Sequence, residues 1–255
     1  MPAPHNRFKQ AIAAGETQIG CWLALANGYT AEVMAGAGFD WLVLDGEHAP
    51  NDIPRLVEQL QALKGGTAEP VIRLPVGETW MVKQVLDIGC QTILVPMIES
   101  AEHARTMAEA MRYPPHGIRG VGSALARASA FGAVQDYLPT ADDQVCLLLQ
   151  VESVRGLAAI EEIAAIDGVD GIFIGPSDLA ADMGHLGKPS HPDVAAAVED
   201  GIRRITAAGK PAGILTFDQT MVRRYIELGV TFAAVGADVA ILRAGASALA
   251  ASFKA

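Results

Sequence analysis

The sequence predicts a (β/α)₈ barrel, a closed ring of eight parallel strands surrounded by helices. Eight short, almost uniformly apolar runs follow one another along the 255 residues, and amphipathic segments alternate with them. Parallel strands covered on both faces read as such runs, and eight βα units occupy roughly 250 residues. An open doubly wound sheet is the alternative, but no GxGxxG motif follows the first apolar run.

The strands and helices are expected in strict alternation. The apolar runs lie at residues 19–25, 41–46, 70–76, 92–98, 145–152, 171–176, 212–217 and 232–237. The amphipathic segments lie at residues 29–37, 52–64, 79–88, 100–111, 156–166, 192–208, 219–228 and 239–253. Glycine ends several of these helical segments just before the next strand, as is typical of a helix C-cap. No linker rich in Pro, Gly or Ser interrupts the pattern, so we expect one domain over residues 1–255.

Composition excludes several classes of protein. The net charge is −10 and no basic cluster occurs, which argues against nucleic acid or an anionic membrane as the partner. The three cysteines are far apart and odd in number, so no disulfide framework is expected. Neither a signal-peptide pattern nor an apolar run of membrane-spanning length is present. We therefore expect a cytoplasmic protein that acts on a small molecule.

Residues 112–143 form an interval too long for an ordinary connection between strand and helix. The interval carries Arg112, Arg119 and Arg127. Long structured loops often have a functional or interfacial role, but a surface excursion with solvated arginines is an equally good interpretation.

Polar side chains gather at the ends of the expected strands. In barrels of this kind, the carboxyl ends of the strands form the active face. The polar or aromatic residues found late in a strand or just after one are Trp22, Asp45, Glu47, His48, Arg73, Gln150, Glu152, Asp178 and Thr216. Strand beginnings contribute few such groups, so the asymmetry predicts a site at one rim.

Two carboxylates at this rim suit a divalent cation. Gln150 and Glu152 are two residues apart, so they point to the same side of an extended strand, and Asp178 follows the next strand. Carboxylate oxygens favour magnesium or manganese over zinc. Taken singly, Glu152 is also explained as the partner of an internal arginine, and Asp178 as a helix N-cap. Together they favour a metal site.

Arg73 lies inside the apolar run PVIRLPV. A guanidinium in such a strand is costly unless it faces a carboxylate or a bound anion. Because a closed barrel has no edge strand, we favour an anion-facing role for Arg73.

His48 follows the second strand by a few residues, close to Asp45 and Glu47. A carboxylate that binds an imidazole fixes its tautomer and raises its basicity, as a general base requires. We expect Asp45 to be that carboxylate. The other histidines, His185 and His191 among them, are expected to be structural.

These residues together predict a metal-dependent enzyme with an imidazole base and an arginine that stabilises negative charge. Proton removal beside a carbonyl, giving an enolate, suits this set. Aldol cleavage, enolisation and decarboxylation all remain open on the residues alone.

The motifs DGEHAPND, PVIRLP, RYPPHGIRGVGSALARAS, LLQVES and GIFIGPSDLAADMGHLGKPSHP resemble those of the metal-dependent (class II) pyruvate aldolases. The resemblance covers nearly the whole chain and is closest to the 4-hydroxy-2-oxoheptanedioate aldolases. It implies retro-aldol cleavage that releases pyruvate and an aldehyde such as succinate semialdehyde, with Mg²⁺, Mn²⁺ or Co²⁺ as cofactor.

The resemblance also implies roles for individual residues. Glu152 and Asp178 would bind the metal, while Gln150 and the backbone around Gly175 and Ser177 would hold pyruvate. Arg73 would stabilise the charge of the enolate, and His48 would serve in acid–base chemistry. The positions near the aldehyde would be Trp22, Val121 and Leu215.

The resemblance pairs the base histidine with a different carboxylate, Asp87 in VLDIGC, and not with Asp45. A residue on a helix reaches a rim histidine most easily across a subunit boundary. This agrees with the implied homohexamer, in which the C-terminal helix is exchanged between subunits. Both carboxylates remain candidates.

Two other functions remain open. An acyl-CoA lyase of the citrate-lyase kind would use the same two carboxylates, and it predicts a CoA-binding surface formed by the arginines of residues 112–127. A barrel that binds a metal but serves only as an assembly scaffold would show no turnover at all.

Overall fold

The computed structural model describes residues 1–254 and confirms the closed barrel. Eight parallel strands pair in chain order, and the eighth closes on the first. The strands are β1 (Gln18–Leu23), β2 (Trp41–Asp45), β3 (Glu69–Arg73), β4 (Thr92–Val95), β5 (Cys146–Val151), β6 (Gly171–Ile174), β7 (Ala212–Leu215) and β8 (Val230–Ala237). Each coincides with a predicted strand to within a few residues.

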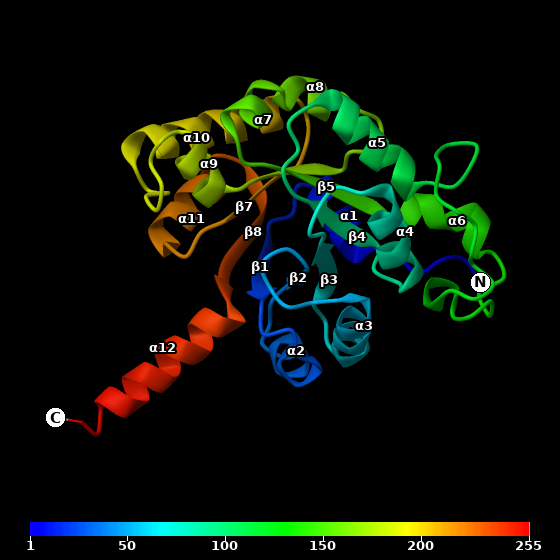
Figure 1. The fold of residues 1–255 in the computed structure, drawn as a ribbon, viewed down its shortest axis with the longest axis horizontal. Coiled ribbons are helices and arrows are strands. Elements are labelled where there is room, and N and C mark those ends of the chain that lie inside the picture. The colour runs from blue at the N-terminus through cyan, green and yellow to red at the C-terminus, as the bar shows by residue number, and fades with distance from the viewer. Residues whose placement is uncertain (255) are drawn as a thin grey trace.

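Helices surround the barrel (Figure 1). The first seven α-helices are α1 (Arg7–Ala13), α2 (Gly28–Ala35), α3 (Ile53–Ala62), α4 (Thr79–Asp87), α5 (Ala101–Met111), α6 (Tyr137–Gln144) and α7 (Val154–Ala158). The remaining ones are α8 (Ile160–Ala164), α9 (Pro176–Asp182), α10 (Pro192–Ala207), α11 (Gln219–Glu227) and α12 (Asp238–Ala251). Short 3₁₀ turns occur at η1 (Leu63–Gly65) and η2 (Arg127–Ser129).

The structure adds detail that the sequence pattern did not predict. Helix α1 precedes the first strand, and its start is capped by the side chain of Asn6, which accepts a hydrogen bond from the backbone N–H of Lys9. The predicted helix at 156–166 is divided at Ala159 into α7 and α8. The long interval 112–143 contains η2 and most of α6.

Aromatic side chains fill the inside of the barrel. Trp41 and Phe232 pack against Phe8 of α1, which lies at the amino-terminal end of the strands. Two glycines make room for these rings. A Cβ on Gly20 would lie 2.3 Å from the Trp41 ring, and one on Gly213 would lie 2.0 Å from the Phe232 ring. The barrel interior is therefore a packed core.

Substituting Gly213 by alanine is expected to lower the free energy of unfolding by about 1–3 kcal/mol, because the added methyl group overpacks a dense core. Urea unfolding followed by circular dichroism measures the change. Gly65→Ala is the matched control, since this residue is exposed and a Cβ there meets no atom within 4 Å. Equal stability of Gly213→Ala and the control would show that the Phe232 ring is free to move aside.

Helix α12 extends away from the barrel, with its C-terminal end far from the other helices (red in Figure 1). Its apolar side chains are largely exposed, among them Ile241, Leu242 and Leu249. Asp238 anchors its first turn by accepting hydrogen bonds from the backbone N–H groups of Ala24 and Leu25. In residues 1–254, no helix has the length and apolar character needed to cross a membrane.

Candidate active site

A cavity of about 360 Å³ opens at the carboxyl ends of the strands. Nine of the predicted site residues line it: Trp22, His48, Arg73, Gln150, Glu152, Gly175, Ser177, Asp178 and Leu215. They come from β1, β3, β5, β7 and the segments that follow β2, β5 and β6. A larger hollow of about 580 Å³ lies at the opposite end, beside α1, and none of these residues lines it. The chemistry therefore points to the smaller cavity.

Arg73, the last residue of β3, is held by two carboxylates at the end of β2 and just after it. It is the neighbour of Asp45 in the strand register, and its Nε and Nη2 donate to the two Asp45 oxygens at 2.9 and 2.7 Å. Its Nη1 lies 2.8 Å from Oε2 of Glu47, and the guanidinium lies 5.3 Å from the centre of the Trp22 ring. The guanidinium is thus fixed in place at the wall of the cavity.

The two carboxylates beside Arg73 respond differently to burial. Burial raises the pKa of Asp45, but the hydrogen bonds and the charge of Arg73 outweigh it and bring this pKa below its ordinary value. Burial also raises the pKa of Glu47, and there the charges of Arg73 and His48 only partly offset it. Asp45 is therefore the firm counter-ion of Arg73, while Glu47 is the more readily protonated of the pair.

His48 projects its ring into the open part of the cavity. Its side chain is 66% exposed, and its Nε2 lies 3.8 Å from Oε2 of Glu47. Asp45 accepts a hydrogen bond from the backbone N–H of His48 at 3.4 Å, and it accepts another from that of Glu47 at 3.0 Å. Asp45 thus holds the backbone of the loop, and Glu47 is the carboxylate beside the imidazole.

Asp87 and Val121 do not line the cavity. Asp87 is the last residue of α4, and its Oδ1 accepts a hydrogen bond from Nη2 of Arg119 at 2.9 Å. A Cβ on Gly122 would lie 3.7 Å from the other Asp87 oxygen, and Val121 beside it is 65% exposed. Within one chain these two residues lie together at a separate place on the surface.

Glu152 is a buried carboxylate whose two hydrogen-bond donors are neutral. Its Oε1 accepts from the backbone N–H of Met97 at 2.9 Å, and its Oε2 accepts from Nε2 of Gln150 at 2.5 Å. Burial raises the pKa of Glu152 to about 7, and the charges of Asp178 and Glu47 add to the rise. Three carboxylates are therefore near one another at the rim.

The backbone approaches this carboxylate closely from two sides. A Cβ on Gly175 would lie 2.4 Å from Oε2 of Glu152, so only glycine fits between β6 and α9. Met97 has a left-handed backbone (φ 55°), an uncommon conformation for a residue with a side chain, and this residue donates its N–H to Glu152. Nothing in the local sequence pattern marks Met97 for this role.

The donor set around Glu152 fits a hard divalent cation. Asp178, in the first turn of α9, is exposed toward the cavity that it lines together with Glu152. A buried carboxylate with two neutral donors carries a charge that a bound cation would offset, and oxygen ligands suit Mg²⁺ or Mn²⁺. Arg73 cannot serve as this counter-ion, because Asp45 and Glu47 already engage it. Oε1 of Gln150 is buried without a hydrogen-bond partner, which leaves an acceptor available beside the carboxylate.

The outer wall of the cavity is mainly apolar and was not predicted. The residues that form it include Phe173, Pro176, Pro189, Phe217, Met221 and Tyr225. These side chains resemble ordinary core residues in the sequence, so only the fold identifies them as part of the site. A wall of this kind selects a ligand by shape more than by charge.

The arginines of the long interval are engaged within the chain. Arg112 pairs with Asp167 at 2.6 Å, and Arg127 donates to the carbonyl of Ile88 at 2.7 Å. Arg119 is fully buried beneath the Tyr113 ring. These contacts remove the basic surface on which a CoA-binding site would depend.

Comparison with known proteins agrees with this geometry. The model of the HpcH/HpaI aldolase/citrate lyase family matches residues 18–244. A hydroxypyruvate/pyruvate aldolase of Roseovarius nubinhibens is 58% identical over 95% of this chain and 94% of its own. A 4-hydroxy-2-oxo-heptane-1,7-dioate aldolase of Klebsiella pneumoniae is 53% identical over 98% of this chain and 94% of its own.

Among solved structures, an HpcH/HpaI aldolase/citrate lyase family protein from Burkholderia cenocepacia superposes with a TM-score of 0.93. It is 43% identical, and the match covers 97% of this chain and 99% of that one. The relatives are named as aldolases, which are lyases, and this confirms the expected class of enzyme. The chain belongs to the HpcH/HpaI aldolase/citrate lyase family.

Proposed function

We propose that this protein is a divalent-metal-dependent aldolase of the cytoplasm that cleaves 4-hydroxy-2-oxo acids. The products are pyruvate and an aldehyde, such as the succinate semialdehyde released from 4-hydroxy-2-oxoheptanedioate. In the reverse reaction, aldol addition, pyruvate is the nucleophile, and the names of the relatives support hydroxypyruvate as a second one. The observation that carries the proposal is Glu152, which is buried beside Asp178 and hydrogen-bonded only to neutral donors.

The proposed chemistry divides the work among a few side chains. Glu152 and Asp178 would hold the cation, which would supply Lewis-acid polarisation of the keto group of the substrate. Gln150 and the backbone at Ser177 orient the substrate carboxylate. Arg73 faces the negative charge that develops on the oxo acid, and the Asp45 ion pair fixes its guanidinium in advance of the reaction.

His48 is the proposed acid–base group. Its exposed ring stands over the cavity, so it can exchange a proton both with the substrate and with water. We propose that Glu47, 3.8 Å from Nε2, orients the ring within the chain. Asp87 would orient the His48 ring only if another subunit placed it beside the cavity, because within its own chain it lies beside Arg119.

We further propose a homo-oligomer, a hexamer in which α12 is exchanged. Ile241, Leu242 and Leu249 are exposed on a helix that extends from the barrel (Figure 1). Burying such a face against another subunit would remove the cost of exposing it to water. Val121, near the Asp87 surface, would then approach the aldehyde end of a neighbouring cavity.

Replacing His48 by alanine is expected to lower kcat for pyruvate release by about 10²–10⁴-fold, the range typical of a lost general base. The KM for the oxo acid should change little, because the cation site stays intact. Steady-state kinetics measure both values, with His5→Ala as the matched control far from the cavity. An unchanged kcat with a raised KM would mean that His48 only binds substrate.

Removal of divalent metal tests the proposed function itself. Pyruvate release from 4-hydroxy-2-oxoheptanedioate is measured with a coupled dehydrogenase before and after exhaustive chelation, and again after Mn²⁺ or Mg²⁺ is restored. Activity should disappear and return with the ion. Full activity in metal-depleted enzyme would refute the metal-dependent mechanism, whereas cleavage of an acyl-CoA substrate in place of the oxo acid would favour the citrate-lyase alternative.

A further inference from the structure

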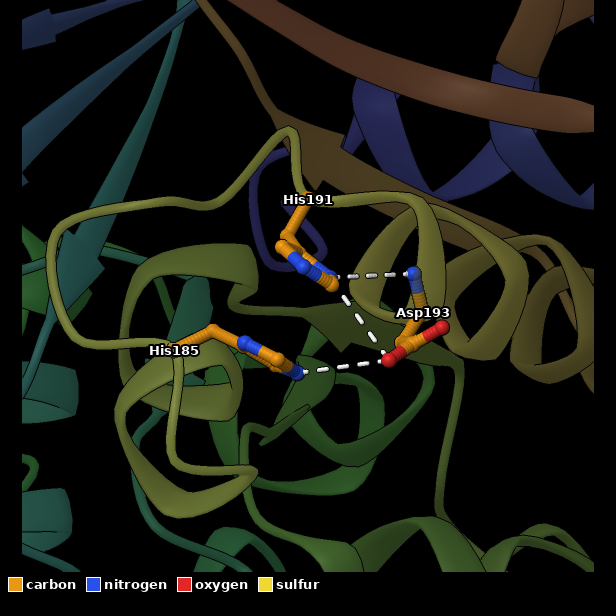
Figure 2. A group of neighbouring side chains, drawn as sticks. All are labelled: His185, His191 and Asp193. Atoms are coloured by element: carbon orange, nitrogen blue, oxygen red, sulfur yellow. Dashed lines mark hydrogen bonds and ion pairs between the residues drawn. The ribbon is translucent and has the colours of Figure 1, made fainter.

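A group of metal-ligating side chains lies in the segment between α9 and α10, apart from Glu152 and Asp178. His185, His191 and Asp193 place one ligand atom each within 4.8 Å of the others, and no other group of three His, Cys, Asp or Glu in residues 1–254 does so. Figure 2 shows the two imidazoles side by side, with the carboxylate of Asp193 facing both. The proposed aldolase chemistry uses none of the three.

The distances suit a transition-metal ion. Nε2 of His185 lies 3.5 Å from Oδ2 of Asp193, and Nδ1 of His191 lies 3.7 Å from the same oxygen. In a tetrahedral site with bonds of about 2.0–2.1 Å, neighbouring ligand atoms are roughly 3.3–3.4 Å apart. The two nitrogen–oxygen separations are therefore close to those around a tetrahedral ion, and the three ligand atoms lie within 4.8 Å of one another.

The hydrogen bonding fixes the protonation of one ligand. Nδ1 of His191 accepts a hydrogen bond from the backbone N–H of Asp193 at 3.3 Å, so this nitrogen carries no proton, and an ion bound to Nδ1 would replace that hydrogen bond. The rings of His185 and His191 are stacked, with centroids 3.7 Å apart and planes 14° from parallel. An ion bound to both rings requires them to tilt toward each other. The partial exposure of both side chains leaves room for this movement.

A helix cap explains only part of the arrangement. His191 caps α10 through its contact with the N–H of Asp193, and this contact does not involve His185. Yet His185, six residues earlier, brings its Nε2 to the same carboxylate oxygen. Two nitrogen ligands and one oxygen ligand that meet at one point match the donor set of zinc-class ions, not that of magnesium.

We propose that His185, His191 and Asp193 bind a Zn²⁺-class ion, with a fourth position open to water. The ion would join the two ends of the segment 185–191, whose Pro189 and Ser190 line the wall of the cavity. Closing a flexible loop with a metal reduces its conformational freedom. This second ion would fix the part of the cavity wall formed by Pro189 and Ser190, and it would take no part in the chemistry at Glu152.

Equilibrium dialysis of the untagged protein against Co²⁺ tests the proposal. A large excess of Mg²⁺ is included, so that Mg²⁺ occupies the carboxylate site at Glu152 and Asp178 and Co²⁺ does not. Elemental analysis should find one Co²⁺ per subunit, with the visible absorption of a four-coordinate ion. His185→Gln and Asp193→Asn each remove a metal ligand and should each weaken Co²⁺ binding by more than about 100-fold. Loss of a group that only orients a ligand typically weakens binding by roughly 10–100-fold. His5→Gln is the matched control and should bind as the wild type does.

Three further measurements keep the result unambiguous. Thermal unfolding of each variant without added metal shows whether the loss of binding follows from misfolding. The Glu152→Gln variant should still bind Co²⁺ at His185, His191 and Asp193. Loss of the proposed aldolase metal site can therefore be distinguished from loss of this second site. Hydrogen exchange of the amides in 185–191 should slow when Zn²⁺ is added. Equal Co²⁺ binding by wild type and His185→Gln, or no binding by either, would overturn the proposal.

Discussion

Substitution of Glu152 by glutamine is expected to reduce kcat/KM for retro-aldol cleavage by roughly 10²–10³-fold or more, since it removes a ligand of the cation that polarises the substrate. Glutamine keeps the size of the side chain and an acceptor for the N–H of Met97. The fold should therefore persist while activity falls. Steady-state kinetics at saturating Mn²⁺ measure the effect.

The matched control for this variant is Glu102→Gln, on the exposed face of α5. It makes the same chemical change without touching the cavity and should leave kcat/KM unaltered. If Glu152→Gln retained wild-type activity at every metal concentration, Glu152 would not be a ligand.

Substitution of Asp45 by alanine is expected to destabilise the protein by about 3–5 kcal/mol, the cost of breaking a buried ion pair by removing one partner. The lower end applies here because Glu47 still contacts Nη1 of Arg73. Activity should fall as well, since Arg73 loses the partner that orients it. Urea unfolding at neutral pH measures the stability.

The same pair gives the stability a defined pH dependence. Folding lowers the pKa of Asp45, so its stabilising contribution is present above the unfolded value of about 4 and is lost as pH falls through the folded value. The difference between wild type and Asp45→Ala should therefore shrink in acid. Asp200→Ala, which removes an exposed partner of Arg204, should change stability by less than about 0.5 kcal/mol. A similar change in both variants would mean that burial adds nothing to the Asp45 pair.

The fold was predictable because each strand is a continuous apolar run with polar residues at one end. That asymmetry also brought seven of the predicted strand-end residues to one cavity, since the carboxyl ends of parallel strands meet at one rim. Glu152 and Asp178 were found in this way from strand-end position alone.

Pairings between side chains were not predictable in the same way. Asp45 was expected to support the His48 ring, but its register places it opposite Arg73, which takes up both of its oxygens. Oε2 of Glu47, which also contacts Arg73, is the carboxylate oxygen 3.8 Å from the imidazole, and chain spacing does not distinguish Glu47 from Asp45. Met97 is a further case, because its role depends on a backbone angle and not on its side chain.

The resemblance to the class II aldolases named Asp87 and Val121 as site residues, and within one chain they lie away from the cavity. The neighbouring Arg119 holds Asp87 in a fixed position at the surface. Its proposed contact with a histidine therefore depends on assembly.

A cation held by Glu152 at the barrel mouth would make the methyl group of pyruvate acidic. Exchange of the methyl protons of pyruvate for deuterium, followed by NMR in D₂O without any aldehyde, tests it most directly. We predict rapid exchange with Mn²⁺ or Mg²⁺, and none above background after chelation or in Glu152→Gln. Exchange at the wild-type rate in the chelated enzyme or in Glu152→Gln would contradict the account.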